Sequence, residues 1–251
     1  MAQDEIKVKS LKKALDVLNC FLIKPTWGVT EISDRLGLYK SNVYDILTTL
    51  KAMDYLEKDE ETERYKLGMQ VFALSRAMED TFSIIKIAMP YMQELANITD
   101  ERVYLAIPHE GEVVYLDATY PAESVNLMRS ILGERAEMHC TGIGKAMLAN
   151  LSEEEIKEYL EKELTIYTDH TISDAAQLRK ELEVTRQRGY AIDNMEHEFG
   201  VKCVAMPIFD KSHKLYAAIS VSGLAVHFTE EKIESWALQM KKYVAKIENR
   251  L

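Results

Sequence analysis

The feature that most constrains this chain is a pair of short amphipathic patterns that meet at a glycine, in VTEISDRLGLYKSNVYDILTTL (residues 29–50). Two short helices that cross at a steep angle need a small residue at their contact, and Ser33 is placed there. The turn between them needs a residue that tolerates positive φ, which Gly37 supplies. With Thr30 as the expected cap, the pattern predicts a helix-turn-helix.

The second helix of this pattern carries polar side chains on the face opposite its apolar residues. In a helix-turn-helix that face enters the major groove of double-stranded DNA, where Asn can read adenine and Ser or Thr can bond bases or phosphates. The alternative is an ordinary amphipathic helix with a solvated outer face. The candidate DNA-contacting residues of this helix are Lys40, Ser41, Asn42, Tyr44, Asp45 and Thr48.

The sequence that follows, YLEKDEETERYKLG (residues 55–68), is typical of two short strands joined by a polar turn. Such a hairpin is the wing of a winged helix-turn-helix. Its acidic tip, residues 59–61, would be repelled by phosphate, so the cations on the strand stems are the better phosphate contacts. These candidates are Lys58, Arg64 and Lys66.

An amphipathic helix should precede the motif, with Ser10 as its N-cap and its end before Pro25. Its apolar residues recur with helical spacing, which predicts one buried face. They are Leu11, Ala14, Leu15, Leu18, Phe21 and Leu22.

The charge of the chain is unevenly distributed. Residues 1–75 hold 11 Lys and Arg against 12 Asp and Glu, a net charge of −1, so residues 76–251 carry −9 of the total of −10. A nearly neutral first segment can still bind phosphate if its cations lie on one face. The acidity of the chain therefore does not exclude a nucleic-acid partner.

Cysteine usage and hydropathy indicate the compartment. Three cysteines lie far apart and form no CxxC pair, which argues against a disulfide framework or a structural zinc site and for a reducing environment. No apolar run approaches the roughly 20 residues that span a bilayer, and the N-terminus lacks an export signal. We expect a cytoplasmic protein with no membrane partner, no bound metal and no cofactor.

The second part of the chain predicts an α+β domain. A helical stretch over residues 69–98 leads into strand patterns at residues 102–109 and 112–120, with a third strand possible within 125–131. Helical patterns follow, then strand patterns at residues 190–195, 201–210 and 214–223, and a closing amphipathic helix over 229–250. One antiparallel sheet with flanking helices would resemble a GAF domain.

Two features of this domain indicate a small-molecule site. Gly142 and Gly144 open a helix, whose backbone N–H groups could seat a carboxylate; alternatively, the glycines only allow tight packing. The stretch is not a nucleotide P-loop, because the GxxxxGK[ST] pattern is absent. Ser220 and Ser222, two apart on a strand, place both hydroxyls on one face, toward either a ligand or solvent.

The run from SLKKALDVL through VTEISDRLGLYKSNVYDILTTL to YLEKDEETERYKLG resembles the N-terminal domain of the IclR family of bacterial transcriptional regulators. HCTGIGKAMLANLS, RGYAIDNMEHEFGVKCVAMPIFD and LYAAISVSG resemble that family's effector-binding domain, in the same order. The resemblance implies a winged helix-turn-helix over residues 1–75, a helical linker over 76–99 and a GAF-like effector domain over 100–251.

The resemblance also implies the residues of the effector site, which in this family takes small organic acids. They are Met128, Ala136, Gly142, Ile143, Asp193, Cys203, Ser220 and Ser222. Two departures from the family pattern matter. Tyr44-Asp45 stands where members often carry His-Arg, which alters the base contacts, and Ile143 replaces a common Ala, which reshapes the pocket.

We therefore expect a non-enzymatic, ligand-responsive regulator, a repressor rather than an activator, that binds a double-stranded DNA operator as a homodimer or homotetramer. Its effector would be a small carboxylate-bearing metabolite. The alternatives are a thiol hydrolase using Cys140 with His139 or Cys203 with His197, a metal site of His139, His197 and Cys203, and a regulator acting only through partner proteins.

Overall fold

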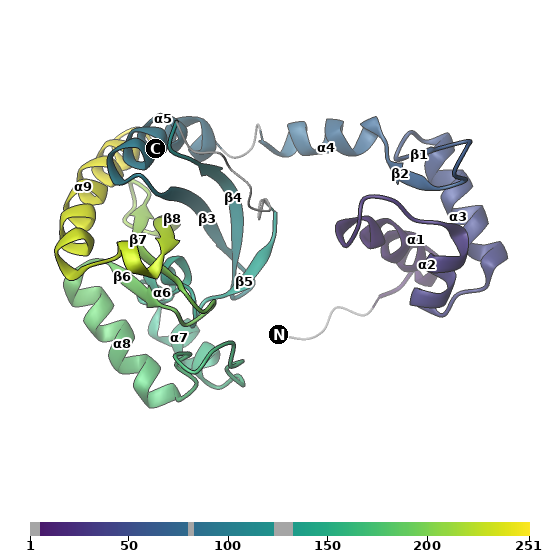
Figure 1. Cartoon of the computed structure of the whole chain (residues 1–251). Coiled ribbons are helices and arrows are strands. Elements are labelled where there is room, and N and C mark those ends of the chain that lie inside the picture. Colours follow the sequence, from purple (N-terminus) through teal and green to yellow (C-terminus); the bar gives the residue numbers. More distant parts are fainter. Residues whose placement is uncertain (1–5, 80–82, 123–132) are drawn as a thin grey trace. The chain divides into compact units, whose positions relative to one another are not determined.

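The computed structural model describes residues 6–79, 83–122 and 133–251, and the chain folds into two compact units, Met1–Thr81 and Phe82–Leu251 (Figure 1). The elements of the first unit are α1 (Lys9–Asn19), the 3-10 turn η1 (Cys20–Leu22), α2 (Val29–Leu36), α3 (Lys40–Ala52), β1 (Leu56–Lys58), β2 (Tyr65–Leu67) and α4 (Met69–Glu79). The expected helix-turn-helix and wing are therefore confirmed as structure.

The corner between α2 and α3 is built as the spacing predicts. Gly37 ends α2 with φ +63°, in the left-handed region that favours glycine. Ser33 is buried at the helix contact, and its hydroxyl donates a hydrogen bond of 2.6 Å to the Leu38 carbonyl oxygen. The small residue thus fixes the turn as well as leaving room for the crossing.

The caps of the first helices differ from the prediction. Gly28, not Thr30, is the N-cap of α2, and the Glu31 carboxylate accepts a hydrogen bond of 2.9 Å from the Gly28 N–H. Val8 is the N-cap of α1, with no side-chain cap, so Ser10 lies inside the helix. The carboxylate of Glu31 therefore caps the start of α2, where we expected the hydroxyl of Thr30 to do so.

Helix α1 does not bury the single face that its spacing predicted. The buried residues of α1 and η1 are Val17, Cys20 and Phe21. Leu11, Leu15 and Leu22 are exposed. Because the helix packs along the line of Val17, Cys20 and Phe21, a second apolar strip is left on the surface of the unit.

The second unit contains one antiparallel sheet with strand order β5-β4-β3-β8-β7-β6. Its strands are β3 (Arg102–His109), β4 (Glu112–Thr119), β5 (Arg135–Glu137), β6 (Ala191–Asn194), β7 (Val201–Phe209) and β8 (Leu215–Leu224). Glu110 and Gly111, both with positive φ, connect β3 to β4, as a tight hairpin turn requires. The prediction of an α+β domain with one antiparallel sheet is confirmed.

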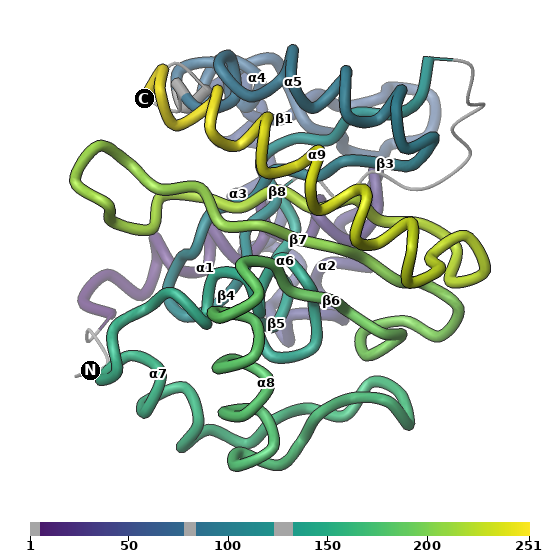
Figure 2. Tube along the Cα trace, turned by 90° about the vertical axis from the view of Figure 1, so that its left-hand side faces the viewer, coloured from purple at the N-terminus to yellow at the C-terminus, as the bar shows by residue number. Residues whose placement is uncertain are grey.

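Helices cover both faces of this sheet. They are α5 (Ser83–Thr99), α6 (Gly142–Leu148), α7 (Glu153–Leu160), α8 (Ala175–Arg188), the 3-10 turn η2 (Ala225–His227) and α9 (Glu230–Glu248). Figure 2 shows α5 and α9 above the strands and α7 and α8 below them; α6 packs with α7 and α8 in the core of that second face. The sheet therefore has two separate hydrophobic cores, one on each face.

The range expected as a linker, residues 76–99, contains the end of α4 and the whole of α5. Helix α5 belongs to the core of the second unit, where Ile84, Ala88, Met92 and Leu95 are fully buried. Each fully buried large apolar side chain stabilises a fold by roughly 1.5–3 kcal/mol, so α5 is firmly anchored to its sheet. The expected break near residues 80–83 falls mostly outside the described residues.

Candidate functional site

The outward face of α3 is polar and solvated. Val43 and Leu47 are fully buried beneath the helix. All six of the residues predicted to contact DNA on this helix are exposed: Lys40, Ser41, Asn42, Tyr44, Asp45 and Thr48. The geometry required for groove reading is thus present, while contact with DNA stays a prediction.

A further exposed aromatic side chain lies at the start of this helix. Tyr39, the N-cap residue of α3, is 81% exposed, more than Tyr44 at 54%. Sequence reasoning missed it because it precedes the helix and lies outside the helical periodicity. Tyr39 and Tyr44 are thus two exposed aromatic rings, one at the start of α3 and one on the helix itself.

Each wing cation is paired with a carboxylate. Lys58 bonds Glu63, and Lys66 lies 3.0 Å from Glu57. The contacts of Arg64 are more extensive: its guanidinium donates to the Glu31 carboxylate at 2.7 Å and to both the hydroxyl and the carbonyl oxygen of Thr26 at 3.1 Å. Arg64 therefore ties the wing to the start of α2, a structural role that the sequence did not reveal.

The second unit contains a cavity of about 410 Å³ on the α6 face of the sheet. The volume lies in the range of ~300–1,000 Å³ that small-molecule sites occupy. Six predicted effector residues line it: Ala136, Ile143, Asp193, Cys203, Ser220 and Ser222. Gly142 lies directly behind the wall, and Met128 lies outside the described residues.

The two glycines of α6 are required for packing. A Cβ on Gly142 would meet the Cys203 sulphur at 2.5 Å, and one on Gly144 would meet the Met138 Cα at 2.4 Å. The Gly144 N–H donates to the Thr141 hydroxyl at 3.1 Å. One N–H group of the backbone seat expected for a carboxylate is therefore already used within the protein.

Polar side chains form a row across four neighbouring strands of the cavity wall. Arg102 on β3 is paired in register with Ser222 on β8, Ser222 with Cys203 on β7, and Cys203 with Asp193 on β6. Residues paired in this way point to the same face of a sheet. The row therefore runs across the floor of the cavity, with a guanidinium at one end and a carboxyl group at the other.

A buried ion pair lies beside the Asp193 end of the row. Lys145 of α6 is 1% exposed, and its ammonium lies 2.6 Å from Glu196 and 3.5 Å from Glu181. The Glu196 N–H donates to the Asp193 carboxylate at 2.7 Å. Burial raises the pKa of Asp193 to about 7 and also raises the pKa of Glu196.

Sequence reasoning missed several residues of the cavity wall, among them Arg102, Tyr104, Tyr115, Thr141 and His197. Tyr104 and Tyr115 contact each other edge to face, with ring centroids 5.6 Å apart. Arg102 and Tyr104 follow the same alternation as Ser222 and Ser220, so the register of β3 against β8 is the signal that would have found them.

The geometry does not support thiol chemistry. Burial raises the pKa of Cys140 to about 12 and raises that of Cys203 further, so neither sulphur forms a thiolate near neutral pH. The ring nitrogens of His139 lie 3.2 Å from the Tyr159 hydroxyl and 2.9 Å from the Thr165 carbonyl oxygen. The ring of His139 therefore bonds Tyr159 and Thr165, and not the thiol of Cys140.

Within residues 6–79, 83–122 and 133–251, no three His, Cys, Asp or Glu side chains are grouped as metal ligands. In the same part of the chain, every helix is too short or too polar to cross a lipid bilayer.

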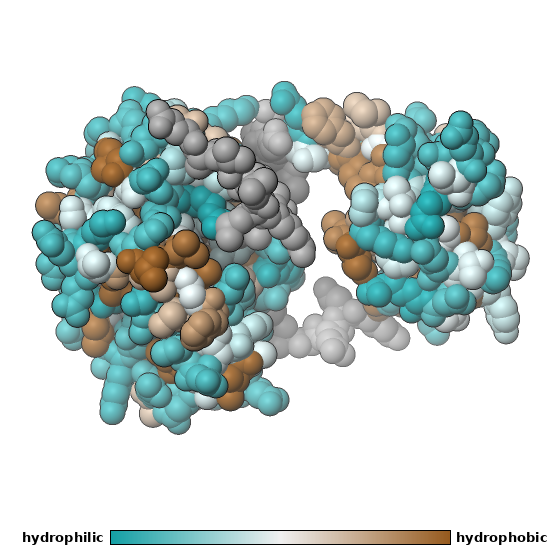
Figure 3. Space-filling model, viewed as in Figure 1, coloured by the Kyte–Doolittle hydropathy of each residue, from teal (hydrophilic) through white to brown (hydrophobic). Residues whose placement is uncertain are grey.

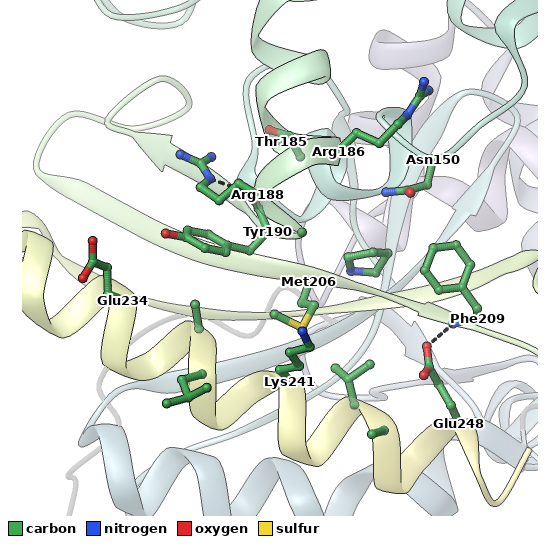
Figure 4. Close-up of a pocket in the computed structure, with 16 residues that line it drawn as sticks. Asn150, Thr185, Arg186, Arg188, Tyr190, Met206, Phe209, Glu234, Lys241 and Glu248 are labelled. Carbon is green, nitrogen blue, oxygen red and sulfur yellow. Dashed lines mark hydrogen bonds between the residues drawn. The ribbon is translucent and has the colours of Figure 1, made fainter.

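An open groove of about 650 Å³ lies between α8, β7 and α9 (Figure 4). It contains none of the predicted effector residues. Its cations are partly engaged: the Arg188 Nε donates to the Tyr190 carbonyl oxygen, and the Arg186 Nε donates to the Ala149 carbonyl oxygen. The smaller cavity, with its converging polar side chains, is the better candidate for a ligand site.

Comparisons with known proteins agree with this geometry. A family model described as "Bacterial transcriptional regulator IclR C-terminal" matches residues 77–249, and the "IclR helix-turn-helix domain" matches residues 10–60. The chain is 32% identical over 248 residues to the HTH-type transcriptional regulator KdgR of Dickeya chrysanthemi, which covers 97% of this chain and 80% of that protein.

Solved structures show the same fold over the whole chain. The crystal structure of Thermotoga maritima IclR matches with a TM-score of 0.82 at 34% identity, covering 97% of this chain and 98% of that one. An IclR homologue of Microbacterium hydrocarbonoxydans in complex with 4-hydroxybenzoate matches with a TM-score of 0.83 at 23% identity, covering 96% and 98%. The chain belongs to the IclR family of DNA-binding transcriptional regulators, which have a ligand-binding C-terminal domain and are not enzymes.

Proposed function

We propose that this regulator is a repressor that holds its operator through the outward face of α3 and changes its DNA affinity when a small organic acid binds in the cavity of the second unit. The observation that carries the proposal is the exposure of every polar side chain on the outer face of α3. Phosphate contacts supply non-specific affinity, while Asn42 is the side chain best suited to reading a base.

We propose further that the chain acts as a dimer or as a dimer of dimers. The exposed Leu11, Leu15 and Leu22 leave an apolar strip on the first unit, and Phe72 and Leu74 of α4 are also exposed. Apolar surface of this kind is typical of association sites. A two-fold dimer would present two copies of α3 to half-sites about one helical turn apart, roughly 34 Å, or a multiple of it.

The second unit has an apolar patch as well. Phe199, Leu224 and Val226 are exposed, and the Ala225 N–H donates to the Gly200 carbonyl oxygen at 2.7 Å, which holds their two segments together. Figure 3 shows hydrophobic residues gathered over η2 on this face of the unit. A second copy of the chain is the partner we propose for this patch.

The cavity supports an acid as effector. The Arg102 guanidinium faces it, together with the hydroxyl groups of Ser220 and Ser222. The Microbacterium homologue, which shares this fold, holds the carboxylic acid 4-hydroxybenzoate. To act as a switch, the acid must bind one conformation of the regulator more tightly than the other.

DNA binding is tested with the purified full chain and a labelled fragment from upstream of its own gene, by fluorescence anisotropy at low salt. We expect unaided binding that Asn42→Ala weakens by roughly 1–3 kcal/mol. The matched control is Asn249→Ala, which alters an exposed residue after α9 and should leave binding intact. No binding to any upstream fragment, or binding only with an added protein, would favour a regulator that acts through partners.

A further inference from the structure

The carboxylate of Glu31 lies in the surface of the first unit that is proposed to face DNA. A hollow of about 350 Å³ lies between the start of α2 and the wing, and Glu31 lines it together with Lys58 and Arg64. Tyr44, on the outer face of α3, lines the same hollow. In a helix-turn-helix the helix before the recognition helix crosses the DNA backbone, so an acid at this place lies beside phosphates and repels them.

Glu31 holds two cations. Its Oε1 accepts a hydrogen bond of 2.7 Å from the Lys24 ammonium, and its Oε2 accepts one of 2.7 Å from the Arg64 guanidinium. The hydrogen bond from Lys24, followed by that from the Gly28 N–H, lowers the pKa of Glu31 to about 2. The carboxylate is therefore ionised near neutral pH, and both cations are already paired when the chain meets DNA.

The wing does not need this carboxylate to stay in place. Trp27 and Tyr65 exchange two backbone hydrogen bonds, of 3.0 and 2.8 Å, and both side chains are buried. Arg64 also donates to the hydroxyl and to the carbonyl oxygen of Thr26, at 3.1 Å each. Because the two ion pairs of Glu31 are partly solvated, they add little to this anchoring. The main effect of Glu31 on the two cations is therefore electrostatic.

Glu63 repeats the arrangement on the wing. Its exposed carboxylate is bonded to Lys58, and both residues line the same hollow. Asp34 provides the contrast, because it is exposed on the same helix as Glu31 but holds no cation among the residues that the structure describes. Glu31, Glu63 and Asp34 thus carry the same charge and hold two cations, one cation and none.

Counterion release connects these pairs to DNA affinity. Each cation that contacts a phosphate releases about one counterion from the duplex, which strengthens binding at low salt and makes the affinity fall more steeply as salt rises. A cation held by a carboxylate has to exchange one anionic partner for another before it contacts phosphate. The gain from that contact is therefore smaller than for a free cation.

We propose that the Glu31 carboxylate limits the sequence-independent affinity of this regulator for DNA by competing with phosphate for Lys24 and Arg64, and that Glu63 does the same for Lys58. The inference rests on the proposed function, whose phosphate contacts it specifies. The two acids leave a larger share of the binding energy to the bases that α3 reads. They also keep the affinity low enough for an effector, which typically changes it by about 5- to 150-fold, to release the duplex.

Variants of the full chain that remove one negative charge test the proposal, by fluorescence anisotropy with scrambled DNA across a salt series. Glu31→Gln keeps an oxygen that can accept the Gly28 N–H but releases two cations. It should bind scrambled DNA roughly 3- to 30-fold more tightly at low salt, and the salt slope of log affinity should steepen by up to about two units. Glu63→Gln releases one cation and should steepen the slope by about one unit.

The matched control is Asp34→Asn, which removes the same charge from the same helix as Glu31→Gln without releasing a cation. It should leave the salt slope unchanged. Glu63→Gln alters an exposed side chain and keeps the proposal testable if Glu31→Gln fails to fold. Unchanged or weaker binding in the Glu31 and Glu63 variants, or an equal steepening in Asp34→Asn, would overturn the inference.

A double substitution tests whether a released cation causes the gain. Lys24→Met in the Glu31→Gln background should reduce the steepness of the slope by about one unit, whereas Lys24→Met alone should change it less, because Glu31 already neutralises Lys24 in the wild type. A merely structural role of Glu31 predicts a looser wing, with weaker DNA binding and a lower unfolding midpoint together. Equal effects of Lys24→Met in the two backgrounds would contradict the proposal.

These outcomes separate the inference from the proposed function. A chain that binds its upstream DNA through Asn42, but whose salt slope does not change in Glu31→Gln, refutes the role of the carboxylate and leaves the operator proposal standing. Tighter binding of scrambled DNA by Glu31→Gln, in a chain that prefers no upstream fragment, supports the carboxylate's role and refutes the proposed operator contacts. A chain that binds no DNA with or without these substitutions refutes both.

Discussion

The outer face of α3 and the floor of the cavity both carry polar side chains, yet they do so under opposite conditions. On α3 the polar side chains of the outer face, such as Lys40, Asn42 and Thr48, are exposed, so their hydrogen bonds with water are exchanged for bonds with a partner. In the cavity, Asp193 and Ser220 are almost fully buried. Substitutions on α3 should therefore change binding alone, whereas substitutions below the cavity should also change stability.

This difference in exposure also explains which site residues could be predicted from the sequence alone. The exposure of Asn42 and Tyr44 follows from helical periodicity, which a single stretch of sequence contains. The row from Arg102 to Asp193 joins segments about ninety residues apart, and only the register of four strands brings them together. Serines two apart on one strand were recognisable; the arginine opposite them was not.

Two other observations have similar physical causes. The phosphate contact of Arg64 stays a prediction, but its bonds to Glu31 and Thr26 were not predicted, because these partners lie more than thirty positions away. The apolar spacing of α1 predicted burial, but Leu11 and Leu15 are exposed. Periodicity identifies an apolar face without showing whether the same chain covers it.

The largest expected effect concerns the buried pair below the cavity. Lys145→Met should lower the free energy of unfolding by about 3–5 kcal/mol, because it leaves Glu196 buried without its cation. Lys12→Met, which breaks an exposed pair with Asp16, should cost at most about 1 kcal/mol. Urea unfolding of both variants measures the contrast, and similar losses would show that the pair below the cavity is not special.

The next largest effect compares two glycines, one required by close packing and the other by its backbone conformation. Gly144→Ala should destabilise the chain by about 1–3 kcal/mol, because the new methyl group would press on the Met138 backbone. Gly37→Ala meets no neighbour and should cost only about 1 kcal/mol, from its positive φ. Chemical denaturation measures the free energy of unfolding of both variants. A Gly144→Ala variant as stable as wild type would mean that α6 can shift away from the Met138 backbone.

The pH dependence of stability should reveal the burial of Asp193. Its pKa of about 7 exceeds the unfolded value of about 4, so the folded chain binds a proton more tightly. Stability should therefore fall as pH rises between about 4 and about 7, by on the order of 1–3 kcal/mol from this group. Asp193→Asn should unfold at a higher temperature than wild type at about pH 8 and show no such gain at about pH 5.

The smallest effect belongs to the α3 face. Lys40→Ala should weaken binding to all DNA sequences alike and reduce the salt slope of log affinity by about one unit, while leaving the unfolding midpoint unchanged. Anisotropy titrations across a salt series, with operator and scrambled DNA, give both quantities. A loss confined to one DNA sequence would reassign Lys40 from phosphate to base contact.

The most direct test joins the two regions in one measurement. Operator affinity is determined for the wild type and for the Ser220→Ala, Ser222→Ala double variant, with and without the acid that stabilises the wild-type chain most. We expect equal affinities without the acid and a change on adding it in the wild type alone. A double variant that responds to the acid like wild type would contradict the claim that this cavity governs the DNA-reading helix.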